Sequence, residues 1–458
     1  MVRTSHAFIL AFAGMFLIAI IAFIGGWTAS NAAGNPPFGS FATTLVFPAE
    51  NNEANTPSEI EEEFAVFWDV WHLVDEEFYH VDPIDRQQMV YGAIRGMLAS
   101  LGDDYTIFQE PEIAEKSRES MSGKFEGIGV YMSVRDGQLI VERPIKQSPA
   151  MKAGLLSGDV IVAVDGVAMA PFIRELGESK AMEEASTRIR GEKDSTVTLT
   201  IYRETTDTTF DVDIVRDEVP LISVYGQMLA NGVAYIAITE FKATTTKELD
   251  EILRELLPQN PTGIVLDLRN NPGGFLTTAQ EVSGRFYEGT ALYEEDSQGH
   301  ITELRTIGAE QDMQVFDLPM LVLLNGRSAS ASEIVAGALR ERRPNTILLG
   351  ERSFGKGSVQ NVHKMRDESS VRITIAQWLT PDQNHIHKVG ITPDFVVPYL
   401  QEDRFAVPCI AEQQPPEGLD TCQDSQLSWS LRLLTDHDPA DQLAPTGTLH
   451  ELRVIEAV

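Results

Sequence analysis

The sequence predicts a mixed α/β protein whose main domain is built on a largely parallel sheet, with an inserted β-rich domain and an N-terminal helical segment. Three patterns predict this fold class. Over residues 217–400, the short continuous apolar runs GVAYIAI, GIVLDL, LPMLVLL and NTILLG lie among helical stretches, which is typical of buried parallel strands. Residues 124–216 contain short strands in which apolar and polar residues alternate. Residues 59–120 begin with apolar residues spaced three and four apart, as on one face of a helix.

The composition limits the classes of partner. The chain has 458 residues, 43% of them hydrophobic, so it is long enough for two or three domains with their own cores. Its 68 acidic residues outnumber 36 basic ones and give a formal net charge of −32. Since a nucleic-acid-binding protein needs a basic surface, we expect no nucleic-acid partner.

Residues 1–34 predict a membrane anchor or a secretion signal. Residues 4–49 contain no Lys, Arg, Asp or Glu, and residues 7–27 form a nearly continuous apolar run. A membrane-spanning helix needs about 20 such residues, whereas the apolar part of a signal peptide has about 7–15. Because Arg3 precedes the run, we expect a single-pass anchor in the cell membrane with the bulk of the chain outside the cytoplasm. The small residues at 28–33 leave open a cleaved signal and a secreted or periplasmic protein.

Residues 35–58 are rich in Ala, Asn, Pro and Gly without periodicity, and are predicted to be a linker. The helical segment of residues 59–120 follows, with a second helix over residues 86–101. The apolar stripe of the first helix is interpreted as a packing surface rather than a ligand site. The stripe consists of Phe64, Phe67, Trp68, Trp71, Val74 and Phe78.

Residues 124–216 are predicted to form a separate peptide-binding domain. The segment SPAMKAGL begins a short helix, with Ser148 as its N-cap and Pro149 at its first position. This segment, its continuation LSGDVIVAVDGV and the motif GIGV together resemble a bacterial PDZ domain. Glycines let successive backbone N–H groups converge on a peptide carboxylate, while the next strand accepts the peptide as an added strand. The resemblance implies a peptide-binding loop formed by Gly127, Ile128, Gly129 and Val130; by themselves these four residues also fit a plain turn.

Two polar segments follow predicted strands of the domain at residues 217–400. RNNPGG, residues 269–274, follows the apolar run GIVLDL, and SASASEIVAG, residues 328–337, comes after LVLLNG. Active sites of folds with parallel strands lie at the carboxyl ends of those strands. We therefore expect these two segments to meet in the site.

The serine segment has two interpretations, which do not exclude each other. Ser330 and Glu333 fit a capping box, which is the simpler explanation of the local pattern. A serine at a helix entrance also lies near free backbone N–H groups and the positive end of the helix dipole, which stabilise a developing oxyanion. To attack, such a serine needs a base to take its proton.

Lysine is a better candidate for this base than histidine. The nine histidines are scattered, and no serine lies in a Gly-x-Ser-x-Gly motif. Lys356 lies between two glycines in SFGKGSVQ, and burial in an apolar pocket would lower its pKa so that the neutral amine accepts a proton. Gln360 is suited to orient an amine without adding charge. A surface turn is the alternative for this segment alone. The match of SFGK to the Ser-x-x-Lys motif of penicillin-binding proteins is rejected, because that motif belongs on a helix and its partner motifs are absent.

Three motifs together resemble the carboxy-terminal processing proteases, the tail-specific Ser-Lys peptidases of family S41. They are VLDLRNNPGG, NGRSASASEIVAGAL and GERSFGKGSVQ. The likeness also includes GAIRGMLASLGDDYTIF, the PDZ-like domain and GITPDFVV, and so extends over roughly residues 60–400. The resemblance implies a peptidase core of the ClpP/crotonase type.

The same resemblance implies roles for single residues. Ser330 would be the nucleophile, Lys356 the general base and Gln360 the amide that orients the lysine. Ser328 and Ser332 would be supporting hydroxyls. The oxyanion hole would consist of the backbone N–H of Ala331 and that of Gly273 or Gly274, with the choice between the glycines left open.

Residues 401–458 form an irregular tail with one helical stretch, SQLSWSLRLL. Its two cysteines, Cys409 and Cys422, are predicted to form a disulfide, as is usual for a cysteine pair in an exported protein; two unrelated thiols are the alternative. Two thiols do not complete a tetrahedral metal site, and His385 and His387 would merely share one face of a strand, so no metal site is expected.

The sequence therefore predicts an exported serine endopeptidase that needs no metal or cofactor. It would recognise accessible C-termini of proteins or peptides through the PDZ-like domain and cleave C-terminal segments. The competing interpretation is a catalytically inactive, membrane-tethered adaptor, against which the intact trio of Ser330, Lys356 and Gln360 argues. An oligomer is compatible with the sequence.

Overall fold

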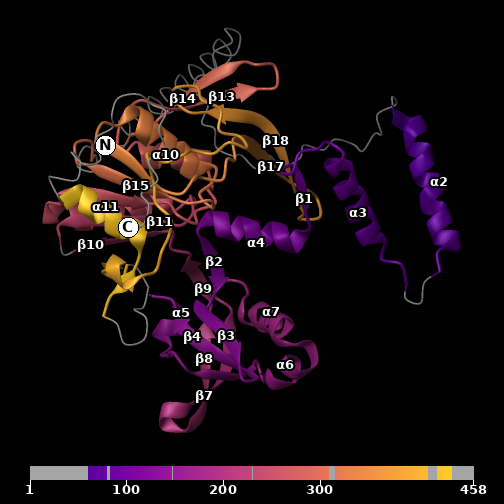
Figure 1. Cartoon of the computed structure of the whole chain (residues 1–458). Helices are drawn as coiled ribbons and strands as arrows, with labels where there is room; N and C mark the ends of the chain where they lie inside the picture. Colours follow the sequence, from indigo (N-terminus) through magenta and orange to yellow (C-terminus); the bar gives the residue numbers. More distant parts are fainter. Residues whose placement is uncertain are drawn as a thin grey trace, which may run out of the picture. The chain divides into compact units, whose positions relative to one another are not determined.

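The computed structural model of the chain (Figure 1) describes residues 60–79, 83–146, 148–229, 231–308, 315–410 and 420–435. The predicted anchor at residues 1–34 and linker at residues 35–58 lie outside these stretches. Within them, no helix is long and apolar enough to cross a bilayer.

The two helices predicted in the N-terminal segment are both present. α2 (Glu61–Glu77) carries the aromatic stripe, in which the rings of Phe67 and Trp68 lie 5.1 Å apart between centroids. No residue of α2 is buried in the described part of the chain. α3 (Arg86–Ala99) begins at Asp85, whose carboxylate accepts a hydrogen bond from a backbone N–H of the first turn.

The segment after α3 contributes a strand to the main domain. β1 (Ile107–Gln109) pairs antiparallel with β18 (Ser370–Leu379), so residues 59–120 are not structurally independent of the core. α4 (Pro111–Ser122) has its proline at the first position and ends at Gly123, which has a φ of 76°. A Cβ at Gly123 would lie 2.2 Å from the Thr244 hydroxyl oxygen, so a side chain there is excluded.

The β-rich domain begins and ends with a strand pair, β2 (Lys124–Gly127) and β9 (Asp217–Pro220). Ser148 Oγ accepts a hydrogen bond from a backbone N–H of the next turn, which confirms the predicted N-cap. The elements between the two strands are β3 (Val130–Arg135), β4 (Gln138–Pro144), α5 (Pro149–Lys152), β5 (Val160–Val164), β6 (Val167–Ala168), α6 (Ala170–Leu176), α7 (Glu178–Ile189), β7 (Thr196–Arg203) and β8 (Thr208–Val215). The strands form an antiparallel sheet in the order β3-β4-β5-β7-β8, with β6 beside β5.

The main domain contains a six-stranded sheet, in which four of the strands are the predicted apolar runs. Its order is β10-β11-β12-β15-β16-β19, and every pairing except β10 with β11 is parallel. The strands are β10 (Val224–Met228), β11 (Val233–Ile238), β12 (Gly263–Asp267), β15 (Met320–Leu324), β16 (Thr346–Gly350) and β19 (Phe395–Val396).

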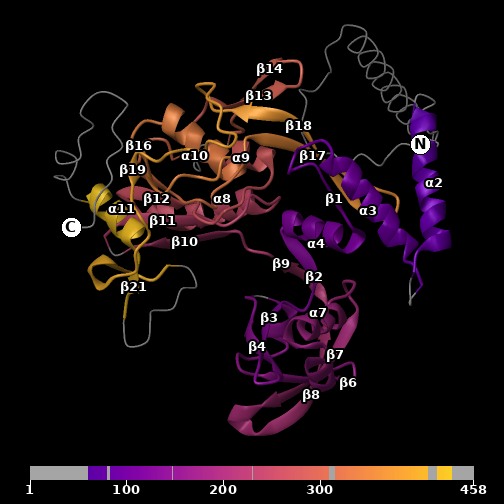
Figure 2. The same cartoon turned by 45° about the vertical axis from the view of Figure 1, so that its right-hand side comes forward.

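Both faces of this sheet are buried, which explains the continuous apolar runs. Successive side chains of a strand point to opposite faces. Ile264 and Leu266 of β12 pack in one core with three helices, whereas Val265 faces a second core. The helices of the first core are α8 (Thr245–Leu256), α9 (Leu276–Ser283) and α10 (Ala331–Arg342); the second core contains α11 (Ser425–Thr435), which Figure 2 shows beside the sheet.

The expectation of a single largely parallel sheet is corrected by a second sheet, which is entirely antiparallel. Its order is β1-β18-β13-β14, with β17 also paired to β18. The added strands are β13 (Thr290–Asp296), β14 (Ile301–Arg305) and β17 (Ser358–Lys364). The fold is thus mixed α/β, with most of its sheets antiparallel. These strands are not continuous apolar runs, because polar and apolar residues alternate in them, as at Arg372, Ile373 and Thr374.

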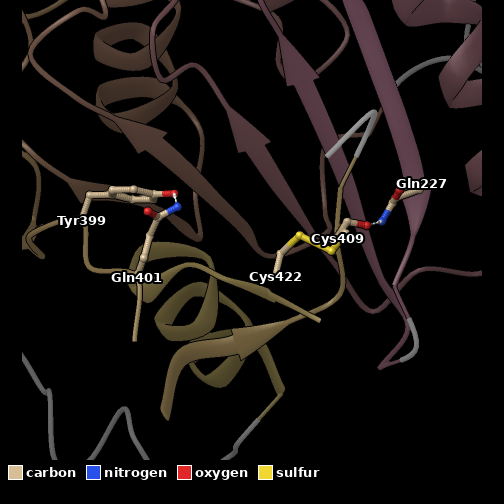
Figure 3. Close-up of a disulfide and its surroundings, with 5 residues drawn as sticks. All are labelled: Gln227, Tyr399, Gln401, Cys409 and Cys422. Atoms are coloured by element: carbon tan, nitrogen blue, oxygen red, sulfur yellow. Dashed lines mark hydrogen bonds between the residues drawn. A yellow bond between two sulfur atoms is a disulfide. The ribbon is translucent and has the colours of Figure 1, made fainter. Parts of the chain in front are cut away.

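The tail beyond residue 400 forms a structured unit, here called the C-terminal module, at residues 401–410 and 420–435. It contains η5 (Asp403–Phe405), the strand pair β20 (Ala406–Val407) and β21 (Cys422–Gln423), and α11, the predicted helical stretch. The structure joins Cys409 to Cys422 in a disulfide. Figure 3 shows this disulfide near Gln227 of β10, whose side-chain amide donates to the Cys409 carbonyl at 3.1 Å.

We expect Leu427→Ala to lower the free energy of unfolding by about 2–5 kcal/mol, because the Leu427 side chain is fully buried between α11 and the sheet and its removal leaves a cavity. Urea unfolding followed by fluorescence measures the effect. Leu176→Ala is the control, since Leu176 is 46% exposed and its loss should cost less than about 1 kcal/mol. Equal effects of the two substitutions would contradict the packing role of α11.

Candidate active site

Ser330 lies at the end of the loop from β15 to α10, where it is the N-cap of the helix. Its φ of 55° and ψ of −114° are strained for a residue with a side chain, and such a conformation persists only where the surroundings impose it. The buried neighbouring serines provide this constraint. Ser328 Oγ donates to the Leu268 carbonyl at 2.8 Å, and Ser332 Oγ donates to the Asn271 carbonyl at 3.0 Å.

The Asn-Pro-Gly-Gly segment lies directly against the serine loop. A Cβ at Gly273 would come within 2.7 Å of Ser330 Cβ, so this approach requires glycine. The Gly273 N–H donates to Asn271 Oδ1 at 2.8 Å and is therefore engaged. Within the described residues, the backbone N–H groups of Gly274 and Ala331 have no hydrogen-bond partner. Of the two glycines, Gly274 thus has the available donor.

Glu333 joins the serine loop to the loop between β16 and β17, which carries Lys356. Its carboxylate is fully buried. Oε2 accepts hydrogen bonds from the backbone N–H of Ser330 and that of Lys356, both at 2.8 Å. Oε1 accepts from the Gly355 N–H at 2.7 Å and from Ser353 Oγ at 2.6 Å. The backbones of the two predicted catalytic residues are therefore bound to one oxygen atom.

The side chain of Lys356 is half-buried, and its Nζ lies 5.1 Å from the centroid of the Tyr105 ring. Burial is the main cause that lowers the pKa of Lys356, and the positive charge of Arg372 on β18 lowers it further. The negative charges of Asp103 and Glu333 raise it by smaller amounts. The net shift is downward, so a larger fraction of the amine is neutral at a given pH, as a general base requires.

Gln360 makes contacts other than the expected one. It lies on β17, where its Nε2 donates to Ser358 Oγ at 2.7 Å and to Thr374 Oγ1 at 3.4 Å. No hydrogen bond joins it to Lys356 within the part of the chain that the structure describes. Its role in orienting the lysine stays a prediction.

The predicted peptide-binding loop, residues 127–130, forms the turn between β2 and β3. The carbonyl of the buried Ile128 accepts a hydrogen bond from the Ala150 N–H at 2.8 Å. Gly129 has a φ of 74°, and a Cβ there would lie 2.5 Å from Ser148 Cβ. The loop is thereby fixed against the start of α5; its binding of a peptide stays a prediction.

Tyr105, whose ring lies near the Lys356 amine, and Arg372, whose charge lowers the pKa of that amine, were not predicted from the sequence. Pairing of β1 with β18 carries the preceding Tyr105 to this sheet, and pairing of β17 with β18 joins the strand of Arg372 to the strand that follows the lysine loop. Tyr105 lies within the quoted motif GDDYTIF, which was the one available signal. Arg372 lies on a strand with no motif of its own. Glu333 was identified only as half of a capping box, because its second set of partners lies 20 or more residues away.

Three family models match the chain. The model described as Peptidase family S41 matches residues 232–397, and the model described as PDZ domain matches residues 127–214. The model described as Activating protease CtpB N-terminal domain matches residues 40–113.

Similar proteins carry related names. Carboxy-terminal processing protease CtpB of Bacillus subtilis (strain 168) is 34% identical over 348 residues, which cover 75% of this chain and 69% of that protein. The carboxyl-terminal-processing protease of Picosynechococcus sp. is 36% identical over 334 residues, covering 72% of this chain and 77% of that protein. Among solved structures, the photosystem II D1 C-terminal processing protease is 31% identical, with 72% of this chain and 86% of that chain covered and a TM-score of 0.42.

We expect Glu333→Gln to slow the labelling of Ser330 by a fluorophosphonate about tenfold or more, because an amide nitrogen cannot accept the hydrogen bonds that one carboxylate oxygen receives and the serine and lysine loops would separate. Mass spectrometry of the labelled peptide measures the rate. Glu248→Gln is the matched control, since Glu248 also accepts from two backbone N–H groups, those of Ser223 and Val224, neither of which belongs to the serine or lysine loop. It should lower stability without slowing the labelling. Unchanged labelling of Glu333→Gln would rule out the coupling of the loops.

Proposed function

Since this chain belongs to peptidase family S41, as a carboxy-terminal processing serine protease with a PDZ domain, we propose that Ser330 and Lys356 are its catalytic dyad and that it cleaves C-terminal segments of exported proteins. One observation carries the dyad. Glu333 Oε2 accepts from the backbone N–H groups of both residues, which brings a strained serine at a helix entrance together with a lysine whose pKa is lowered.

The acylation step follows from these groups. Neutral Lys356 Nζ takes the proton from Ser330 Oγ as the oxygen attacks the carbonyl carbon of the scissile peptide bond. The oxyanion that forms accepts hydrogen bonds from the backbone N–H groups of Ala331 and Gly274. We favour Gly274 over Gly273 because Asn271 already engages the Gly273 N–H. The lysine ammonium then protonates the leaving amine, the C–N bond breaks and the acyl-enzyme remains.

Deacylation uses the same groups with water as the nucleophile. Lys356 takes a proton from the water as the water oxygen attacks the carbonyl carbon of the ester, and the same amide donors stabilise the second oxyanion. The proton returns to Ser330 Oγ as the ester bond breaks, and the new C-terminal carboxylate leaves. Gln360 is retained as the amide that orients the lysine, since it lies on the strand that follows the lysine loop.

The PDZ domain supplies the recognition of a protein C-terminus. We assign the loop at residues 127–130 to the peptide carboxylate and β3 to pairing with the peptide as an added strand. The attachment of this loop to the start of α5 supports a preformed site, because the backbone need not rearrange on binding.

The substrates are proposed to be exported because the chain itself has the features of an exported protein. The apolar run at residues 7–27 supports a membrane anchor or an export signal. The Cys409–Cys422 disulfide supports an oxidising compartment outside the cytoplasm.

We expect Ser330→Ala to abolish cleavage of a peptide with an apolar C-terminus while leaving peptide binding unchanged, because the hydroxyl acts in the chemical step and the PDZ domain binds separately. Product chromatography and fluorescence anisotropy with the full-length chain measure the two effects. Ser157→Ala, at an exposed serine of the PDZ domain, should retain activity. Cleavage by the Ser330→Ala variant would disprove the dyad, and a wild-type chain that binds the peptide without cleaving it would favour the adaptor.

We expect kcat/KM to rise with pH through the lowered pKa of Lys356, because only the neutral amine accepts the serine proton. Arg372→Gln should displace the rising part of the profile to higher pH, since it removes a positive charge that lowers the lysine pKa. Initial rates over a pH series measure both. Arg305→Gln, at an exposed arginine of the same sheet, should leave the profile in place. A flat profile, or equal profiles for the two arginine variants, would count against lysine as the base.

A further inference from the structure

A buried cation, Arg269, begins the segment of residues 269–274, here called the oxyanion loop. Its side chain is 9% exposed. Nη2 lies 2.6 Å from Asp267 Oδ2, and Nε lies 3.0 Å from both oxygens of the same carboxylate. The Tyr235 hydroxyl donates to Asp267 as well, at 2.8 Å. Within the main domain, then, Arg269 has one counter-ion and still has an unused nitrogen, Nη1.

The C-terminal module supplies the partners of the remaining donors. Arg269 Nη1 donates to Asp424 Oδ1 at 3.1 Å and to Gln426 Oε1 at 3.0 Å, and Nη2 lies 2.9 Å from Asp424 Oδ2. Asp424 is 5% exposed and Gln426 is fully buried. In a buried network of this kind, removal of one charged partner leaves the others uncompensated. The first residue of the oxyanion loop is therefore held by a segment about 155 residues further along the chain.

The disulfide fixes the segment that presents Asp424. Asp424 lies two residues after Cys422, and the bond to Cys409 joins the two described stretches of the module (Figure 3). Val407 of β20 is paired with Cys422 of β21. The strand β21 is therefore held both by its pairing with β20 and by the disulfide. The Cys409 carbonyl in turn accepts from Gln227 of β10. The module is thus attached to the main domain at two places, at Gln227 of β10 and at Arg269, which Asp424 contacts.

From Arg269 the backbone leads directly to the proposed oxyanion donor. Asn270 has a φ of 59°, in the left-handed region. Asn271 then accepts from the Gly273 N–H, and its Nδ2 donates to the Ile238 carbonyl at 2.7 Å. Four residues separate Arg269 from Gly274, and hydrogen bonds hold three of them, Asn270, Asn271 and Gly273. The position of Arg269 therefore constrains the position of the Gly274 amide through a short, stiff stretch of backbone.

We propose that the C-terminal module positions the oxyanion loop: Asp424 and Gln426 hold Arg269, and the Cys409–Cys422 disulfide holds the strand that presents them. Asp424 and Gln426 are positioning residues, since neither touches the substrate. The inference rests on the proposed use of the Gly274 amide as an oxyanion donor. It gives the disulfide a role in catalysis: with the disulfide reduced, the enzyme is slower.

The first test separates the charge of Asp424 from its structural role. The Asp424 carboxylate also caps α11 by accepting from the Leu427 N–H at 2.9 Å. Asparagine caps a helix as well as aspartate does, so Asp424→Asn keeps the cap and removes the charge that Arg269 binds. We expect about tenfold lower kcat with KM within about twofold, because the donor is displaced while substrate binding is not. Asp403→Asn, at an exposed aspartate of the same module, is the matched control and should retain kcat.

The second test breaks the disulfide. Dithiothreitol supplies two electrons and two protons, the bond between Cys409 and Cys422 becomes two thiols, and the reductant becomes a cyclic disulfide. Full-length wild type treated in this way, and the double variant Cys409→Ser/Cys422→Ser, should show the same loss of kcat. Reoxidation should restore the wild type, and the reductant should not affect the double variant. Hydrogen–deuterium exchange of the peptide covering residues 268–275 should increase in every form that loses kcat.

These experiments test the positioning role of the C-terminal module separately from the proposed function. If the exchange of residues 268–275 is unchanged in Asp424→Asn and in the reduced protein, the module does not hold the loop. If the exchange increases but kcat stays the same, the loop is held without serving the reaction, and the positioning role is wrong. If oxidised wild type shows no Ser330-dependent cleavage, the proposed function fails, while the exchange measurement still decides whether the disulfide holds the loop.

Discussion

The site depends on one buried carboxylate, that of Glu333. Four donors from two loops converge on its two oxygens: the N–H groups of Ser330, Gly355 and Lys356 and the hydroxyl of Ser353. A buried carboxylate is costly unless hydrogen bonds replace its hydration. Within the described residues no cation forms an ion pair with Glu333, so these four bonds provide the compensation. Three of the four donors are backbone N–H groups, so the bonds that stabilise the carboxylate also fix the backbones of the serine and lysine loops.

This arrangement places opposing demands on Lys356. The negative charge of Glu333 raises the pKa of the lysine and so works against its proposed use as a base, and the carboxylate of Asp103 acts in the same direction. Burial and the nearby charge of Arg372 act oppositely and are the larger effects. The Tyr105 ring, which attracts a cation, favours the protonated amine as well. Glu333 thus fixes the geometry of the site, while burial and the positive charge of Arg372 outweigh its effect on the pKa of Lys356.

The strain at Ser330 and the close approach of Gly273 have a common origin. The serine loop and the Asn-Pro-Gly-Gly segment are joined through Asn271, whose carbonyl accepts from the Ala329 N–H at 3.0 Å and from Ser332 Oγ at 3.0 Å. Two loops held this tightly leave no room for a Cβ at Gly273, and the same Asn271 side chain engages the Gly273 N–H. The neighbouring amide of Gly274 therefore remains as the free donor. The C-terminal module holds the other end of this segment through Arg269, so the tail is part of the structural support of the site.

The sequence by itself determined the features that are local or carried by a motif: the apolar strands β11, β12, β15 and β16, the N-caps at Ser148 and Ser330, and membership of the peptidase family. These follow from burial on both faces of a sheet, from hydrogen bonds within one turn, and from contiguous residue types. Only the tertiary structure decided the antiparallel second sheet, the partners of Glu333, the electrostatic influence of Arg372 on Lys356 and the network of Arg269 with the tail. Each of these depends on the pairing and register of segments far apart in the chain, and the choice of Gly274 depends on which N–H the Asn271 side chain engages. Neither periodicity nor local propensity indicates such contacts, because they form only once the strands have paired in the folded protein.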